Sequence, residues 1–201
     1  IKGDNKQNEL YINNGDLTFT EMAADYGLDD TGYSTHAAFF DYDRDGDLDC
    51  YLLNNSYKGG FRITNIGTNQ RPIRDSVGGD KLFRNDDGYF NDVSEESGIY
   101  GSVIGFGLGV TVGDVNNDGW MDIYVSNDFF ERDYLYINNA DGTFSEELEY
   151  QIKSISAASM GADMADINND GYSEIFVTDM LPEPDERIKT VTTFDNWDRH
   201  Q

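Results

Sequence analysis

Three short segments of the chain place acidic and amide side chains at alternate positions around a glycine. The segments are 41–49, 114–122 and 166–174. Each carries Asp or Asn at positions 1, 3 and 5, Gly at position 6, and Asp or Glu at position 9. Short oxygen-bearing side chains at this spacing converge on one point, and the Gly allows the backbone to turn there. Because calcium prefers six to eight hard oxygen ligands, the pattern predicts one calcium site in each segment.

The predicted ligands are four side chains in each loop and the backbone carbonyl at position 7. An EF-hand would carry a bidentate Glu at position 12, but that position is Leu52, Val125 or Val177, so the EF-hand is excluded. We therefore expect about three Ca²⁺ ions, bound by loops of another kind. The predicted ligands are Asp41, Asp43, Asp45 and Asp49 with the carbonyl of Asp47; Asp114, Asn116, Asp118 and Asp122 with the carbonyl of Trp120; and Asp166, Asn168, Asp170 and Glu174 with the carbonyl of Tyr172.

The same acids argue against catalysis. Paired carboxylates can hydrolyse glycosides, but these recur in every unit, whereas an active site normally occurs once. The two histidines, His36 and His200, belong to no triad or zinc spacing, and we expect them at the surface or at strand ends. Cys50 is the single cysteine, which excludes an internal disulfide, and we expect it to be a small buried hydrophobic residue. The sequence predicts a protein that is not an enzyme.

A second motif accompanies the acidic loops. Leu-Tyr-Ile-Asn or a close variant begins at Leu10, Leu82 and Leu135, and a Gly and a Phe follow each copy. The acidic loops are 73 and 52 residues apart, and these motifs are 72 and 53 residues apart. Two different motifs that keep the same irregular spacing indicate a true internal repeat.

Each repeat reads as a set of short strands. Runs rich in Val, Ile and aromatic residues precede and follow every acidic loop, and the second motif adds a hairpin. About four antiparallel strands in a unit of roughly 50 residues are typical of a β-propeller blade. Helix is expected only as a turn or two, at 20–26 or 92–97. We predict an all-β fold, a segment of a β-propeller with about three four-stranded blades, and a calcium loop between the first two strands of each.

The repeat also predicts how the chain is divided. We interpret 1–201 as part of one propeller domain and, because it starts with Ile1, as a segment of something longer. The predicted parts are a partial blade at 1–34, a blade at 35–98 with an inserted loop at 56–80, a blade at 105–150, the start of a blade at 158–181 and a connecting tail at 182–201.

The inserted loop is the one locally basic region of an acidic chain. It contains Lys58, Arg62, Arg71 and Arg74. Two interpretations stay open, an ordinary connection between strands and an insertion that contacts a partner or ligand.

Composition limits the possible partners. The chain has 39 acidic and 14 basic residues and a formal charge of −25, so nucleic-acid binding is not expected. Its 13 Tyr, 12 Phe and 2 Trp are too many for a disordered acidic tail. No apolar stretch approaches the ~20 residues of a membrane-spanning helix, so we expect no transmembrane segment in this part of the protein.

The residues resemble a known family. Phe106-Gly107, the following 109–113 and the second acidic loop are similar to the FG-GAP or VCBS repeat of integrin α-subunit propellers and their bacterial relatives. More narrowly, 179–190 with 195–199 resembles the large VCBS-repeat surface proteins of Bacteroidota that carry ASPIC/UnbV domains. That resemblance implies an exported cell-surface lipoprotein associated with the outer membrane. It also implies a subunit of a larger assembly, alongside glycan-uptake transporters.

The resemblance implies binding and no defined reaction. The leading hypothesis is a non-enzymatic, calcium-binding propeller module of an exported surface protein. It would serve either protein or glycan interaction or complex assembly, and nutrient uptake at the outer membrane is one setting for this role. One alternative is a carbohydrate-binding lectin whose sugars lie on Trp120, Tyr172, Phe129 and Phe130. Another is an accessory part of a polysaccharide-degrading enzyme.

Overall fold

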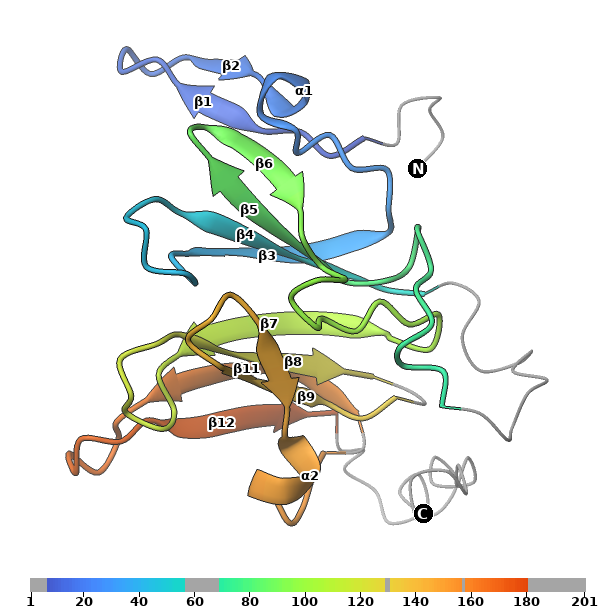
Figure 1. Ribbon diagram of the computed structural model, residues 1–201, viewed down its shortest axis with the longest axis vertical. Helices are drawn as coiled ribbons and strands as arrows, with labels where there is room; N and C mark the ends of the chain where they lie inside the picture. The colour runs from blue at the N-terminus through green and yellow to red at the C-terminus, as the bar shows by residue number, and fades with distance from the viewer. Residues whose placement is uncertain (1–6, 57–68, 129–130, 157, 181–201) are drawn as a thin grey trace.

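A computed structural model describes residues 7–56, 69–128, 131–156 and 158–180 of the chain (Figure 1). The predictions made for the tail at 182–201 and for Phe129 and Phe130 concern residues outside these ranges. The same applies to His200, Lys58 and Arg62.

The described residues form twelve strands and two single-turn helices, which fall into four units along the chain. The first unit holds β1 (Tyr11–Asn13), β2 (Phe19–Glu21) and α1 (Ala23–Tyr26). The second holds β3 (Ser34–Phe40), β4 (Asp49–Asn54), β5 (Lys81–Asp86) and β6 (Tyr89–Asp92). The third holds β7 (Gly107–Gly113), β8 (Asp122–Asn127), β9 (Tyr134–Asn138), β10 (Phe144–Glu146) and α2 (Leu148–Gln151), and the last holds β11 (Ser159–Ala165) and β12 (Glu174–Asp179).

Every sheet is antiparallel and follows chain order. Strands β3 to β6 form one four-stranded sheet, β7 to β10 form another, and β1–β2 and β11–β12 are two-stranded. The predicted all-β fold with four-stranded, propeller-type sheets is confirmed. All three acidic loops connect the first two strands of a unit, namely β3 to β4, β7 to β8 and β11 to β12.

Each helical turn follows the last strand of its unit, α1 after β2 and α2 after β10. The expected turn in 20–26 is α1, whereas in 92–97 the first residue ends β6 and 94–97 forms hydrogen-bonded turns and no helix. The sequence analysis did not anticipate α2, which begins at Leu148, a fully buried residue. This single turn is stabilised by packing and not by helix propensity, because an isolated helix of four residues is unstable.

The sheets are stacked face to face, so that a strand inside the stack buries both of its faces (Figure 1). In β4, Tyr51 and Leu53 enter the core shared with the β7–β10 sheet, while Cys50 and Leu52 enter the core shared with the first unit. Successive side chains of a strand point to opposite faces. This explains why β4 reads as a continuous apolar run and does not alternate with polar residues.

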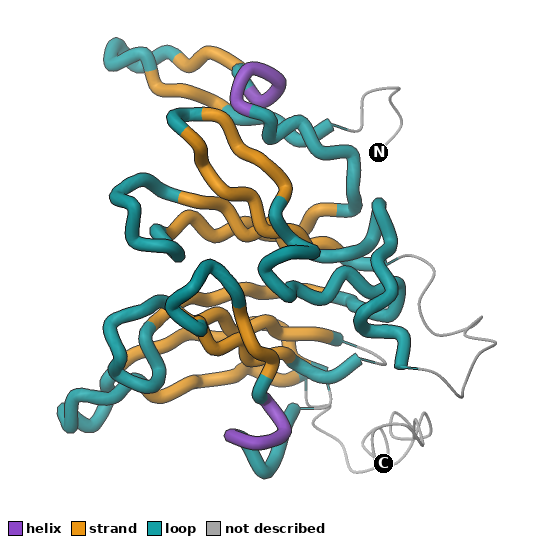
Figure 2. Tube along the Cα trace, viewed as in Figure 1, coloured by secondary structure: helices purple, strands orange, loops and turns teal. Residues whose placement is uncertain are grey.

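The strands β3, β7 and β11, each the first strand of its unit, lie beside one another, and Figure 2 shows the strands of successive units stacked along the long axis of the molecule. The Thr35 hydroxyl donates to the carbonyl of Gly107 at 2.8 Å, and the backbone N–H of Val110 donates to Nδ1 of His36 at 3.3 Å. A Cβ atom added to Gly109 would lie 2.9 Å from the Cα of Gly161. Gly109 therefore allows the backbones of β7 and β11 to approach closely.

Candidate metal centre

The three acidic loops have the same backbone shape. Position 4 adopts the left-handed conformation in each, with φ of 62° at Arg44, 61° at Asn117 and 61° at Asn169. Asn tolerates this region better than Arg does, because its short amide can bond locally. The Gly at position 6 also has a positive φ in all three, from 87° to 100°. The repeated Asn/Asp-Gly chemistry is thus what closes the loop.

The loops are further closed by their own acids. The position-1 carboxylate accepts the N–H of the position-6 glycine, at 3.2 Å for Asp41, 2.8 Å for Asp114 and 2.9 Å for Asp166. This bond draws the first acid over the loop centre. The position-5 acid accepts the N–H of position 7 in every loop, so each carboxylate keeps a fixed orientation.

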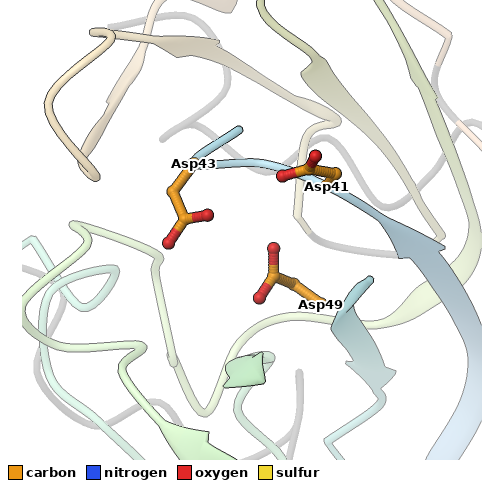
Figure 3. A group of neighbouring side chains, drawn as sticks. All are labelled: Asp41, Asp43 and Asp49. Carbon is orange, nitrogen blue, oxygen red and sulfur yellow. The ribbon is translucent and has the colours of Figure 1, made fainter. Parts of the chain in front are cut away.

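In the first loop these constraints bring three acids together. Asp41, Asp43 and Asp49 each offer a carboxylate oxygen, and the three oxygens lie within 4.8 Å of one another (Figure 3). Oδ1 of Asp41 is shielded from water and accepts no hydrogen bond from the described part of the chain. A shielded carboxylate oxygen without a donor is costly unless a cation lies beside it. An all-oxygen set of this kind can hold a hard metal ion.

The pKa values of buried loop acids also favour a bound cation. Burial raises the pKa of Asp43, and Asp45 beside it adds to the effect. Burial also raises the pKa of Asp49 to about 6, against the opposing influence of two backbone N–H donors. In the second loop burial raises the pKa of Asp122. A raised carboxyl pKa means that the negative form is disfavoured, and a bound cation would reverse this penalty.

The acid at position 9 also connects the loop to the rest of the sheet. Asp49 is buried and accepts the N–H of Tyr42 at 3.1 Å and the N–H of Asn85, in β5, at 2.9 Å. Asp122 is buried in the same way and accepts the N–H of Val115 at 3.0 Å and of Asn138, in β9, at 2.8 Å. The predicted last ligand of the metal thus also holds the third strand of the sheet against the loop.

The third loop is arranged differently at this position. Glu174 is only partly buried, and it accepts the N–H of Ile167 at 2.9 Å and the side-chain amide of Asn168 at 2.6 Å. Both donors belong to the same loop. Within the described residues, the group Asp41, Asp43 and Asp49 is the one place where three or more potential metal-binding acids, histidines or cysteines meet. The second and third loops carry Asn at position 3, where the first loop carries Asp43.

Sequence reasoning missed a second pair of buried acids. Oδ1 of Asp80 accepts the N–H of Asn54 at 2.9 Å, and Oδ2 accepts the hydroxyl of Tyr51 at 3.0 Å. Asp133 makes the same two contacts, at 2.8 Å with the N–H of Asn127 and 2.6 Å with the hydroxyl of Tyr124. Burial raises the pKa of Asp80 to about 7. The sequence contains a signal for these two acids, because each precedes the Leu of the repeated hairpin motif by two residues.

The aromatic residues at position 7 differ in their surroundings. Trp120 is partly buried, and the guanidinium carbon of Arg44, from the first loop, lies 5.2 Å from the centre of its ring. Tyr172 in the third loop is 54% exposed. Only the first two loops are therefore joined by a contact of this kind among the described residues.

The other residues singled out from the sequence have structural roles. Cys50 is buried as expected, and burial raises its thiol pKa to about 12, which leaves no reactive thiolate at neutral pH. In the inserted loop, Nε of Arg71 donates to Glu131 at 2.8 Å, and Arg74 donates to the carbonyls of Asp80 and Ile99. The two arginines of this loop that the structure describes are thus engaged inside the molecule, which favours a structural connection.

Comparison with known proteins agrees with this architecture. A family model described as FG-GAP-like repeat matches residues 2–52, 73–125 and 114–177, which include all three acidic loops. Integrin alpha-3 of Mus musculus and integrin alpha-3 of Cricetulus griseus are each 30% identical to the chain over 99 residues. The alignment covers 43% of this chain and 9% of each integrin, so the chain spans a small part of the curated relatives it matches. None of the described helices has the length and apolar character needed to cross a membrane.

Proposed function

The chain belongs to the family of FG-GAP-like repeat proteins, and on that premise we propose that it is a calcium-binding propeller module that presents a surface to other molecules. The observation that carries this proposal is the convergence of Asp41, Asp43 and Asp49 in a loop whose sequence pattern recurs twice more. Calcium is the favoured ion because every predicted ligand is a carboxylate, amide or carbonyl oxygen.

In this proposal the metal has a structural role. Calcium would neutralise acids whose pKa values burial has raised, and it would hold the loops in the shape that their backbone bonds already favour. Backbone N–H groups of the loops orient the acids, and Asp41 Oδ1 is shielded from water. Ion binding to the folded form alone stabilises the fold.

We propose no catalytic activity. The acids of the loops are occupied by backbone N–H groups and are repeated from unit to unit, and Cys50 has no thiolate at neutral pH. His36 is engaged by the backbone N–H of Val110. These observations favour a binding module over a part of a polysaccharide-degrading enzyme.

The setting is proposed from the resemblance to the Bacteroidota VCBS-repeat surface proteins. It comprises an exported lipoprotein at the outer membrane, within a larger assembly that contacts surface proteins or glycans. The strongly acidic composition supports the exclusion of nucleic acid as a partner.

Thermal unfolding of the intact protein in calcium and in chelator tests the role of the metal. We expect the melting temperature to rise by at least about 5 °C in millimolar calcium, because three sites would contribute to stability together. Magnesium at the same concentration is the control for ionic strength. Equal melting temperatures in calcium and in chelator would contradict a structural role for the metal.

A further inference from the structure

A cleft of about 440 Å³ opens beside the first two acidic loops, between the β3–β6 and β7–β10 sheets. Four separate parts of the chain contribute to it. They are the first loop, the β5–β6 sheet with the turn that follows, the second loop, and the turn between β9 and β10. The lining residues whose side chains can contact a ligand are Asp43, Arg84, Glu96, Trp120, Asp141 and Thr143.

Trp120 supplies a flat apolar surface in a cleft whose other lining residues, apart from Tyr42, Ala140 and Gly142, are polar or charged. Its indole is partly buried, and Arg44, which does not line the cleft, lies over the ring at 5.2 Å. A guanidinium over an indole is a favourable contact that restricts the motion of the ring. Trp120 is therefore positioned before any ligand arrives, which reduces the entropy lost on binding.

The polar groups around Trp120 are also held in place. Arg84 forms two parallel hydrogen bonds with Asp86, at 2.9 and 3.1 Å, and lies 3.7 Å from Glu96. Asp141 Oδ1 accepts the N–H of Thr143 at 3.1 Å and its hydroxyl at 2.6 Å. Carboxylates accept hydrogen bonds from hydroxyl groups and a guanidinium donates to them, so both kinds of polar contact are available.

The charges of the cleft select among ligands. Three carboxylates, those of Asp43, Glu96 and Asp141, line the cleft together with one guanidinium, Arg84, which is already paired with Asp86. Anions such as phosphates are therefore repelled. Asp43 also belongs to the first-loop acid group, and a divalent ion there would offset the remaining negative charge. A neutral molecule with many hydroxyl groups and an apolar ring face fits this combination.

We infer that this cleft binds a neutral saccharide, with one sugar ring against Trp120 and its hydroxyl groups on Glu96, Asp141 and Arg84. This inference rests on the proposed function, because it names the ligand class and the position of a site on the proposed binding surface. Aromatic side chains with a few fixed polar groups are the usual lining of small-ligand sites.

The test is titration of the intact, calcium-loaded protein with a panel of neutral oligosaccharides of glucose, mannose, galactose and N-acetylglucosamine. We expect saturable binding of at least one of these. We expect Trp120→Ala to weaken that binding at least about tenfold, because the stacking surface is lost. Tyr150→Ala is the matched control, because Tyr150 is an aromatic residue that is 87% exposed and lies outside the cleft.

Calcium titration of the same samples separates the two proposals. Because Trp120 lies in a predicted metal loop, Glu96→Gln provides a second variant that leaves the loops intact, and we expect a several-fold loss of saccharide affinity. Normal calcium binding with no saccharide binding would overturn the saccharide site and leave the proposed calcium role standing. Saccharide binding that is equal in wild type, Trp120→Ala and Glu96→Gln would also overturn it, because the sugar would then bind elsewhere.

Discussion

The first and third acidic loops share a motif and a backbone shape but are connected to the protein in different ways. In the first loop, Asp49 is buried and receives N–H groups from its own loop and from β5. In the third loop, Glu174 is partly buried and receives donors only from its own loop among the described residues. The comparison teaches that a repeated acidic motif does not imply a repeated structural role. The position-9 acid of the first loop also holds β5 against the loop, whereas that of the third loop bonds mainly to residues of its own loop.

The largest expected effect comes from removing the position-9 acid of the first loop, in comparison with the same change in the third loop. Asp49→Ala leaves the buried N–H of Tyr42 and the partly buried N–H of Asn85 without their acceptor, and we expect a loss of about 2–4 kcal/mol in the free energy of unfolding. Glu174→Ala exposes its donors to water, and we expect a loss below about 1 kcal/mol. Denaturant unfolding in chelator measures both losses of stability without any contribution from metal. Equal losses would show that the two loops are connected to the fold alike.

The pH dependence of stability provides a further test of the buried acids in the sheet of the first loop. Burial raises the pKa of Asp80 to about 7 and that of Asp49 to about 6, and both lie in the sheet of the first loop. Because the folded pKa values exceed those of the unfolded chain, folding takes up protons between about pH 4 and 7. In chelator, stability is therefore greatest at the acidic end of this window and falls as the pH rises through it.

Melting temperatures at several pH values check this dependence. Asp80→Asn is the control, because it removes the titrating group but keeps an acceptor for the N–H of Asn54. The slope between pH 5 and 7 should become flatter in this variant. A wild-type protein whose stability rises with pH in chelator would refute the assignment of the buried acids.

The smallest expected effect concerns position 4. In the first loop, Arg44 adopts a left-handed conformation, and its guanidinium lies over Trp120. In the third loop, Asn169 adopts the same conformation, and Tyr172 at position 7 is 54% exposed. We expect Asn169→Arg to cost about 1 kcal/mol of backbone strain. The reciprocal change, Arg44→Asn, should be nearly neutral, because the relief of strain and the loss of the cation–π contact offset each other. Denaturant unfolding compares the two, and a stabilising Asn169→Arg would contradict the strain argument.

The sequence predicted the loops and most of the strands, because these depend on local chemistry. Asn, Asp and Gly at fixed positions determine the turn, and apolar runs on either side form strands wherever the sheets are stacked. The prediction that Cys50 is buried follows from the same run.

What the sequence did not reveal depends on contacts between distant segments. The bonds of Asp80 to Tyr51 and Asn54 require knowledge of which strands pair. The ion pair of Arg71 with Glu131 joins residues 60 positions apart in two different units. The single-turn helix α2 has no strong local signal, and the burial of Leu148 accounts for it.

The most direct test of the account is a calorimetric calcium titration of the intact protein and of its Asp43→Ala variant. Asp43 belongs to the first-loop acid group, and from the described residues it accepts one hydrogen bond, at 3.3 Å from the N–H of Asp45, so we expect its removal to leave the sheet in place. We predict saturable binding that includes one ion for each of the three loops, and one ion fewer in the variant. Absence of saturable binding, or an unchanged number of ions in Asp43→Ala, would contradict the assignment of these loops as metal sites.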